Sequence, residues 1–340
     1  MKIGLITHHR IPNFGANLQA FSTMKALQGL GYDIRIIDYL PEGINERYRK
    51  RGVTEQQFKV HNDFCDTNMV LTNRVDSIGG LIDCCNANEF DLIISGSDSI
   101  FRLNKEMNTC EGGFPNAYWL QWVGNCDNKK IKIACLAGSA MGSAYYSFPK
   151  ELKVKINNAL KKFDYLSVRD TWTKLMFMLV SWGHLVPPIC PDPVSVLNNS
   201  KPFDSVGIPE YSFIKKKYLL ISIEKNIIPS DWMSKFKNEC NNRGYICVGL
   251  PLPEYDMSFL ELDEIIPLPV SPITWYKLIQ NSSGFFGTRF HPVVCSIYNN
   301  KPFVAIDTYC KTGIKNRFHF IKFKLTSKTF DLCRSAGIPN

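Results

Sequence analysis

The feature that most constrains the fold is a regular alternation of short apolar runs with helix-like segments in both halves of the chain. Residues 2–7 form an apolar run, residues 17–30 carry an apolar stripe at helical spacing, and residues 34–39 form the next apolar run. Gly31 follows the stripe as a helix stop signal. A strand, a helix and a second strand in this order predict a parallel sheet with a right-handed crossover.

The second half repeats this alternation, and a length of 340 residues favours two domains. Residues 218–223 and 246–250 are strand-like and flank a helix-like segment at residues 231–242. Several prolines and the polar run Asn198–Ser200 interrupt the pattern between the halves. Because few contacts cross such stretches, we place the domain boundary between about residues 195 and 212.

We therefore expect an α/β fold of two Rossmann-like domains that face each other across a cleft, residues 1–200 and residues 205–340. Residues 41–88 break the alternation and predict either an insertion or a pair of surface helices. Ligands of parallel sheets bind beyond the carboxyl ends of the strands. Site residues are therefore expected where strands end.

Composition limits the classes of partner. The formal net charge of +9 is moderately basic, with a local cluster at residues 47–51. No zinc-finger, homeodomain or RNA-recognition signature accompanies this charge, so we expect no nucleic-acid partner. An anionic small substrate and an anionic membrane surface both fit the charge, and residues 47–51 could touch such a surface. A solvated helix face is the favoured interpretation of this cluster.

The twelve cysteines are spread along the chain and form no CxxC pair. The sequence shows no secretory leader and no apolar run near the ~20 residues that cross a bilayer. We expect reduced, mostly buried thiols, no metal site, and a cytoplasmic protein that could lie peripherally at the inner face of the membrane.

The most informative segment is Gly287–Pro292, which lies between a strand-like and a helix-like run. Such a junction offers unpaired N–H groups and a positive dipole end to an anion. Arg289 adds a bidentate cation and His291 a group that titrates near neutral pH, with Thr288 beside them as a further ligand contact. The alternative is a surface arginine and a capping histidine.

Two further polar segments follow apolar strands in the first half. His8 ends the first strand, and Asn13 and Asn17 flank Gly15 at the start of the following helix. Either asparagine could cap that helix or contact a ligand. Asp98 follows the strand-like run 91–95, where catalytic carboxylates sit in such folds, although it could equally cap the next turn.

Arg169 emerges from a strand at residues 165–168 and is a second candidate cation, whereas Asp170 is expected to cap the next helix. Asp192, between two prolines, is interpreted as a hinge contact rather than a catalyst. Four tryptophans could stack on sugars, although core or interface anchors are the commoner role. They are Trp119, Trp122, Trp232 and Trp275.

Taken together, these residues resemble the polysaccharide pyruvyl transferase family. The matching segments run in the family's order over nearly the whole chain. They are Ile6–Thr7, Asn13–Ala20 (NFGANLQA), Asp91–Asp98 (DLIISGSD), Ser167–Asp170 (SVRD), Asp192–Pro193 (DP) and Gly287–His291 (GTRFH).

The resemblance implies a fold like that of GT-B glycosyltransferases and transfer of a pyruvyl group from phosphoenolpyruvate to sugar hydroxyls as a ketal. It implies that Arg169, Arg289 and His291 hold phosphoenolpyruvate and that Asp98 is the acid or base. Ser97 stands where relatives have a glycine-richer loop, which bears on how Asp98 is placed. Two cations at separate strand ends suit a substrate with a carboxylate and a phosphate.

The division of acid and base between Asp98 and His291 stays open, and no metal or cofactor is expected beyond the donor substrate. The acceptor is expected to be a glycan or lipid-linked saccharide of a surface polysaccharide such as a capsule. Two alternatives are a sugar-nucleotide-dependent GT-B glycosyltransferase and, less favoured, a non-catalytic carbohydrate- or nucleic-acid-binding protein.

Overall fold

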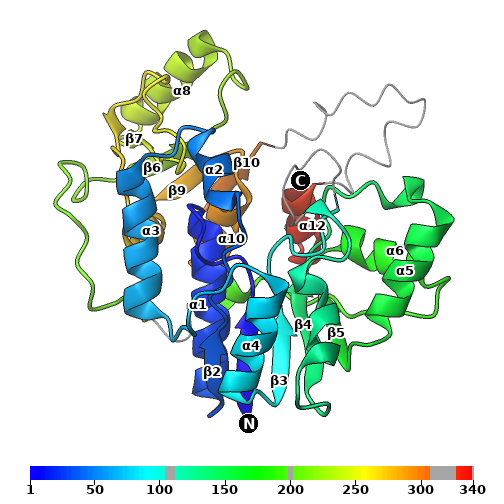
Figure 1. Cartoon of the computed structure of the whole chain (residues 1–340). Coiled ribbons are helices and arrows are strands. Elements are labelled where there is room, and N and C mark those ends of the chain that lie inside the picture. Colours follow the sequence, from blue (N-terminus) through cyan, green and yellow to red (C-terminus); the bar gives the residue numbers. More distant parts are fainter. Residues whose placement is uncertain (104–111, 198–201, 307–326, 339–340) are drawn as a thin grey trace.

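The computed structural model of the chain describes residues 1–103, 112–197, 202–306 and 327–338. Within these residues the chain forms two five-stranded parallel sheets flanked by helices (Figure 1). This confirms the predicted α/β class. Residues 198–201, inside the expected domain boundary, lie outside the described residues, and so do Cys110 and Cys310.

The first sheet has the strand order β2-β1-β3-β4-β5. Its strands are β1 (Lys2–Ile6), β2 (Asp33–Ile36), β3 (Leu92–Ser95), β4 (Lys132–Gly138) and β5 (Tyr165–Val168). Leu5 in β1 pairs with Ile36 of β2 on one side and Ile94 of β3 on the other. Helices cover both faces of such a sheet, which is why its strands read as nearly continuous apolar runs.

Six α-helices of the described chain belong to this first part. They are α1 (Phe14–Gly29), α2 (Ile44–Arg49), α3 (Glu55–Asn68), α4 (Ile78–Asn88), α5 (Lys150–Leu160) and α6 (Thr171–Val180). Helix α1 begins earlier than expected because the Asn13 side chain accepts a hydrogen bond from the Ala16 N–H at 3.2 Å. The stretch 41–88 forms three helices rather than a pair, and α3 packs against α1.

The second sheet has the strand order β10-β9-β6-β7-β8. Its strands are β6 (Tyr218–Ser222), β7 (Ile246–Gly249), β8 (Glu264–Ile265), β9 (Gly284–Gly287) and β10 (Phe303–Ala305). The helices that follow are α8 (Ser230–Asn242), α9 (Pro272–Asn281), α10 (Phe290–Tyr298) and α12 (Lys328–Ser335).

Helix α12 follows the second sheet in sequence but lies beside the first one (Figure 1, red). Its Asp331 carboxylate accepts a hydrogen bond of 2.6 Å from the Thr171 N–H at the start of α6, and Arg334 donates to the Thr171 hydroxyl. The last described helix therefore returns to the first domain, although it falls in the range 205–340 assigned to the second.

One of the hydrophobic cores spans both domains. A single cluster of buried side chains includes Leu5 in β1 and Leu220 in β6. The ring of Phe14, the first residue of α1, stacks on Trp275 of α9 with centroids 5.0 Å apart and an interplanar angle of 13°. Offset stacking of this kind contributes energy beyond area burial, so the cleft between the sheets is closed by packing at its base.

A pair of hydrogen bonds reinforces this packing. The Gln57 amide of α3 donates to the Val270 carbonyl at 2.8 Å, and its oxygen accepts from the Val270 N–H at 2.9 Å. Gln57 also contacts the buried ring of His61, whose other nitrogen bonds to Asn17. Burial lowers the pKa of His61 to about 3, so the ring is neutral and links α1, α3 and the second domain through hydrogen bonds.

We predict that Gln57→Ala lowers the free energy of unfolding by roughly 2–4 kcal/mol, because it removes three hydrogen bonds and leaves the buried backbone of Val270 without partners. Gln56→Ala, at an exposed position of the same helix, is the matched control. Denaturant unfolding of both variants is the measurement. Equal midpoints for the two would show that the domains do not depend on this contact.

Candidate functional site

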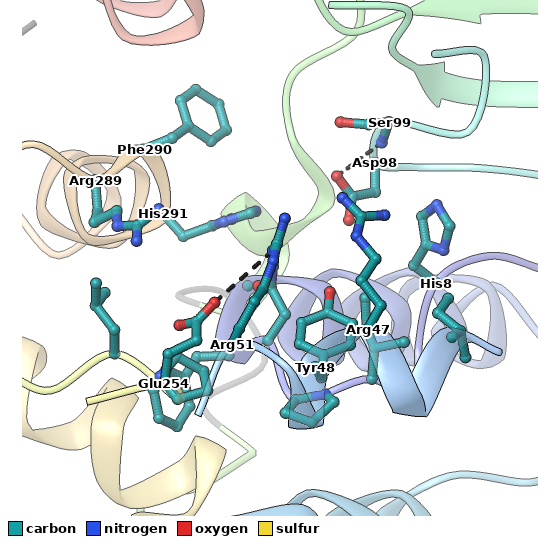
Figure 2. Close-up of a pocket in the computed structure, with 18 of the residues that line it drawn as sticks. His8, Arg47, Tyr48, Arg51, Asp98, Ser99, Glu254, Arg289, Phe290 and His291 are labelled. Atoms are coloured by element: carbon teal, nitrogen blue, oxygen red, sulfur yellow. Dashed lines mark hydrogen bonds and ion pairs between the residues drawn. The ribbon is translucent and has the colours of Figure 1, made fainter. Parts of the chain in front are cut away.

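A cavity of about 350 Å³ lies between the carboxyl ends of the two sheets. Its wall comes from the loops after β1 and β3, from α2, from the start of α10 and from α12 (Figure 2). The ionisable side chains that line it are His8, Arg47, Tyr48, Arg51, Asp98, Arg102, Tyr118, Glu254, Arg289, His291 and Lys328. Groups distant in sequence therefore meet in one space.

His291 reaches this cavity because the facing residue has no side chain. A Cβ built on Gly15, in the first turn of α1, would lie 2.0 Å from the imidazole ring. The His291 side chain is 16% exposed, its Nε2 is 3.9 Å from Asp192, and this nitrogen has no hydrogen-bond partner among the described residues. Burial lowers the pKa of His291 against the opposing effect of Asp192, which leaves the ring neutral near pH 7.

Arg289 precedes α10 and lies at its uncapped amino end. Its guanidinium is 3.5 Å from the Glu224 carboxylate, and the side chain is 36% exposed. The neighbouring Thr288 hydroxyl accepts a hydrogen bond from the Glu224 N–H at 3.2 Å. Thr288 therefore fixes the loop around Glu224 and is not part of the cavity lining, where it had been expected as a ligand contact.

Asp98 is held at the cavity wall by the loop after β3. Its backbone has φ = 77°, a left-handed conformation that is uncommon for aspartate, and the Ser139 N–H donates to its carbonyl at 2.9 Å. Burial alone would raise the pKa of Asp98, but Arg169, with His8, Lys328 and His291, lowers it below its ordinary value. The carboxylate is therefore ionised at neutral pH.

Arg169 lies behind Asp98 rather than in the cavity lining. Its guanidinium is 2.8 Å from Asp192 and 3.5 Å from Asp98, and it lies 5.2 Å from the Phe290 ring centroid. Burial would lower the pKa of Arg169, but Asp192 and Asp98 raise it, so the group stays charged. Asp192 is thus an ion-pair partner, and Asp170 caps α6 through the Thr173 N–H, as the sequence predicted.

The polar residues that end β1 divide between cavity and core. His8 lines the cavity, and its Nδ1 is 3.1 Å from the Tyr118 hydroxyl. His9 and Arg10 instead contact the buried carboxylate of Asp38 at 3.1 and 2.7 Å. His8 is therefore the residue of this run that can meet a ligand.

The two asparagines flanking Gly15 also differ. Asn13 lines the cavity while its side chain caps α1. Asn17 is fully buried, donates to the His9 and Ile11 carbonyls and accepts from His61. Its amide is used in the protein interior, so the structure does not bear out the expectation that it contacts a ligand.

Lys328 is a site residue that the sequence analysis missed. It begins α12, and its ammonium donates to the Ser99 hydroxyl at 2.8 Å, next to Asp98. Burial lowers the pKa of Lys328 to about 8, with Arg169 acting in the same direction and Asp98 in the opposite one. No motif marks this lysine, because only the return of α12 to the first domain brings it to the cavity.

Further lining residues that were not predicted belong to the basic run 47–51, and Arg102, Tyr118 and Glu254 are others. Arg47, Tyr48 and Arg51 line the cavity, whereas Arg49 pairs with Glu55 at the surface. The favoured interpretation of the run as a solvated face therefore holds for only part of it. The basic cluster itself was the available signal, but it does not tell which of its side chains face the cavity.

The tryptophans serve mainly as packing residues. Trp119 and Trp122 are buried in the core of the first domain, and Trp232 stacks on Phe236 of α8. Trp275 is the exception, because it stacks on Phe14 and also lines the cavity. Sugar stacking stays a prediction for Trp232, which is 42% exposed, and for Trp275, which lines the cavity.

Two properties of the described chain bear on cofactors and membranes. Among the described residues, no group of three or more His, Cys, Asp or Glu side chains is placed to hold a metal ion. No helix in the described ranges has the length and apolar character needed to span a bilayer.

Comparison with known proteins gives one family and one fold. The family model for polysaccharide pyruvyl transferase matches residues 13–309. The UDP-GlcNAc 2-epimerase from Neisseria meningitidis bound to UDP-GlcNAc has 13% identity and a TM-score of 0.55 over 90% of this chain and 82% of that one. An S. aureus MnaA-UDP co-structure has 14% identity and a TM-score of 0.51 over 90% and 79%. No curated protein matches the sequence.

At these identities the structural likeness establishes the fold alone. A putative UDP-N-acetylglucosamine 2-epimerase from Listeria monocytogenes agrees, with 9% identity and a TM-score of 0.52 over 90% of this chain and 78% of that one. The predicted GT-B-like arrangement of two Rossmann-like domains is therefore confirmed.

We predict that Gly15→Ala destabilises the protein, because the added methyl overlaps the His291 ring. Alanine ordinarily stabilises a helix by about 1 kcal/mol over glycine, but overpacking costs about 1–3 kcal/mol. Gly29→Ala, with open space at the end of the same helix, is the control and should stabilise.

A double-mutant cycle isolates the contact. In a His291→Ala background the cost of Gly15→Ala should disappear, since the ring that it overlaps is gone. Thermal unfolding of the four proteins is the measurement. An unchanged cost in that background would mean that His291 does not lie against α1.

Proposed function

Because this chain belongs to the polysaccharide pyruvyl transferase family, we propose that it moves a pyruvyl group from phosphoenolpyruvate to two hydroxyls of a sugar and forms a cyclic ketal. Family membership makes the protein a transferase with a saccharide acceptor. The acceptor we propose is a sugar on a surface polysaccharide such as a capsule, or on its lipid-linked precursor, met in the cytoplasm at the inner face of the membrane.

The observation that carries this proposal is the convergence of Asp98, Arg289, His291 and Lys328 on one cavity. They come from the first domain, the second domain and α12, and they supply two fixed cations, one carboxylate and one neutral imidazole. Phosphoenolpyruvate carries a carboxylate and a phosphate, which charge-assisted hydrogen bonds from such cations hold. The same set contains groups able to donate and to accept a proton.

The chemistry balances with these groups and needs no cofactor beyond the donor. Protonation of C3 makes C2 electrophilic, and the first sugar hydroxyl adds to C2 as it loses its proton. The bond from C2 to the phosphate oxygen then breaks, and the phosphate leaves with the electron pair. The second hydroxyl adds to C2 and its proton ends on the departing phosphate, which yields the ketal and inorganic phosphate.

The protonation states divide the roles. Asp98 is ionised, so it cannot donate the proton to C3, and its charge instead stabilises positive charge at C2. The neutral His291 ring accepts the proton of the attacking hydroxyl. Lys328, with a pKa of about 8, is protonated at pH 7 and still acidic enough to donate to C3. Arg169 acts through Asp98 and is a positioning residue.

We predict that Arg289→Ala abolishes phosphate release from phosphoenolpyruvate in the presence of a galactose-type acceptor, with a loss of roughly 100-fold or more and little change in Tm. The half-exposed guanidinium has little part in the core, so its loss should spare the fold. Arg243→Ala, which breaks a surface ion pair with Glu239, is the control.

Two results would contradict this. A large fall in Tm for Arg289→Ala would mark a structural arginine. An absence of phosphate release by the folded wild type with every lipid-linked or polymeric acceptor, together with binding of a sugar nucleotide, would favour a GT-B glycosyltransferase instead.

We also predict that kcat/KM falls as pH rises through about 8. Lys328 is protonated below its pKa and loses its proton above it, so the acid is lost on the alkaline side. Phosphate release measured from about pH 6 to pH 10 tests this. Lys328→Arg keeps the cation but cannot give up its proton, so it should lower kcat/KM over the whole range and remove the fall near pH 8. If the fall of kcat/KM near pH 8 persisted in Lys328→Arg, that fall would belong to the titration of another group.

A further inference from the structure

Helix α2 and the turn that follows it each direct one arginine into the cavity. Arg47 and Arg51 are four residues apart and both line the cavity, with Tyr48 between them (Figure 2). Arg49 points the other way and pairs with Glu55 at 2.7 Å. The basic run thus has one face toward the cavity and one toward solvent.

A third guanidinium joins this pair from another element. Arg102 lies in the loop after β3 and lines the same cavity. Burial lowers the pKa of Arg102, and the positive charges of Arg47 and Arg51 lower it further, which places the three groups within electrostatic reach of one another. The Nε of Arg102 is buried and has no hydrogen-bond partner among the described residues.

Like charges held together this way need an anion. Among the described residues, the carboxylate that forms an ion pair with one of these three arginines is Glu254 of the second domain, which lies 4.0 Å from Arg51. Five cationic side chains line the cavity against two carboxylates, an excess of three positive charges. Phosphoenolpyruvate carries about three negative charges near neutral pH, up to two of them on its phosphate.

Arg169 does not line this cavity, and its guanidinium pairs with Asp192 at 2.8 Å. Arg289 is a single guanidinium at the uncapped start of α10, a suitable partner for one carboxylate in a bidentate contact. A phosphate presents three terminal oxygens and more charge, and it matches a cluster of several guanidiniums.

Resting on the proposed function, we propose that Arg47, Arg51 and Arg102 form the subsite for the phosphate of phosphoenolpyruvate, while Arg289 holds its carboxylate. The phosphate takes the place of Glu254 at Arg51. The three guanidiniums then stabilise the negative charge that gathers on the phosphate as its bond to C2 breaks. The first domain thereby binds the leaving group and the second binds the part that is transferred.

The two halves of the donor can be tested separately with inorganic phosphate and pyruvate as probes. Calorimetric binding of each is measured for the wild type and for Arg47→Gln, Arg51→Gln and Arg289→Gln. We expect Arg47→Gln and Arg51→Gln to weaken phosphate binding about tenfold or more and pyruvate binding less than about twofold, since hydrogen bonds to charged groups are the strong ones. Arg289→Gln should show the reverse pattern.

Arg49→Gln is the matched control, because it removes the same charge from the other face of α2. It should leave both affinities unchanged and so exclude a general effect of net charge. A Tm within a few degrees of the wild type for each variant shows that the fold is kept.

Loss of pyruvate binding with intact phosphate binding in Arg47→Gln and Arg51→Gln would overturn the assignment, and so would unchanged binding of both probes. Binding requires no turnover, so the outcome is separate from that of the proposed function. Selective phosphate binding without phosphate release from phosphoenolpyruvate would support the subsite and reject the transferase reaction. Phosphate release from phosphoenolpyruvate by the wild type, together with unaltered phosphate affinity in Arg47→Gln and Arg51→Gln, would support the transferase reaction and reject the subsite.

Discussion

The contact between the first turn of α1 and the start of α9 and α10 is the interaction on which the cavity depends. Phe14 stacks on Trp275, and the bare backbone of Gly15 admits the His291 ring. These neighbouring residues join the two sheets and place a catalytic candidate of one domain against a helix of the other. The Gln57–Val270 hydrogen bonds hold the same interface from α3. A shift between the domains would therefore move His291 relative to Asp98.

Buried charges that do not line the cavity shift the pKa values of side chains that do. Asp192 and Asp98 share Arg169, and the buried guanidinium keeps Asp98 ionised. Such a buried network is costly to assemble, and removing one partner leaves an unpaired charge in the interior. Arg169 pairs with these carboxylates and does not line the cavity, whereas five other cationic side chains do. Helix α12 completes this set with Lys328, whose lowered pKa follows from its burial among other cations.

Much of the fold and part of the site could be predicted from local patterns. The alternating apolar runs specified two parallel sheets, because strands buried on both faces must be apolar throughout. The same strands located Asp98, Arg289 and His8 at their carboxyl ends, where the cavity opens. Asn17 and Thr288 also follow strand ends in the sequence, but their side chains form hydrogen bonds with other groups of the protein. Strand position alone does not tell in which direction a side chain points.

The sequence by itself determined the α/β class, the strand ends that carry charged groups and the cap at Asp170, since each depends on neighbours within a few residues. It left open which of Asn13 and Asn17 caps α1. Only the tertiary structure decided that α12 crosses to the first domain and that Arg47 of α2 and Arg51 just after it face the cavity. It also decided that Arg169 lies behind the cavity wall. These outcomes depend on contacts between segments far apart in the chain. Burial and Coulomb interactions among such segments, rather than local propensity, selected which cations stay available to a ligand.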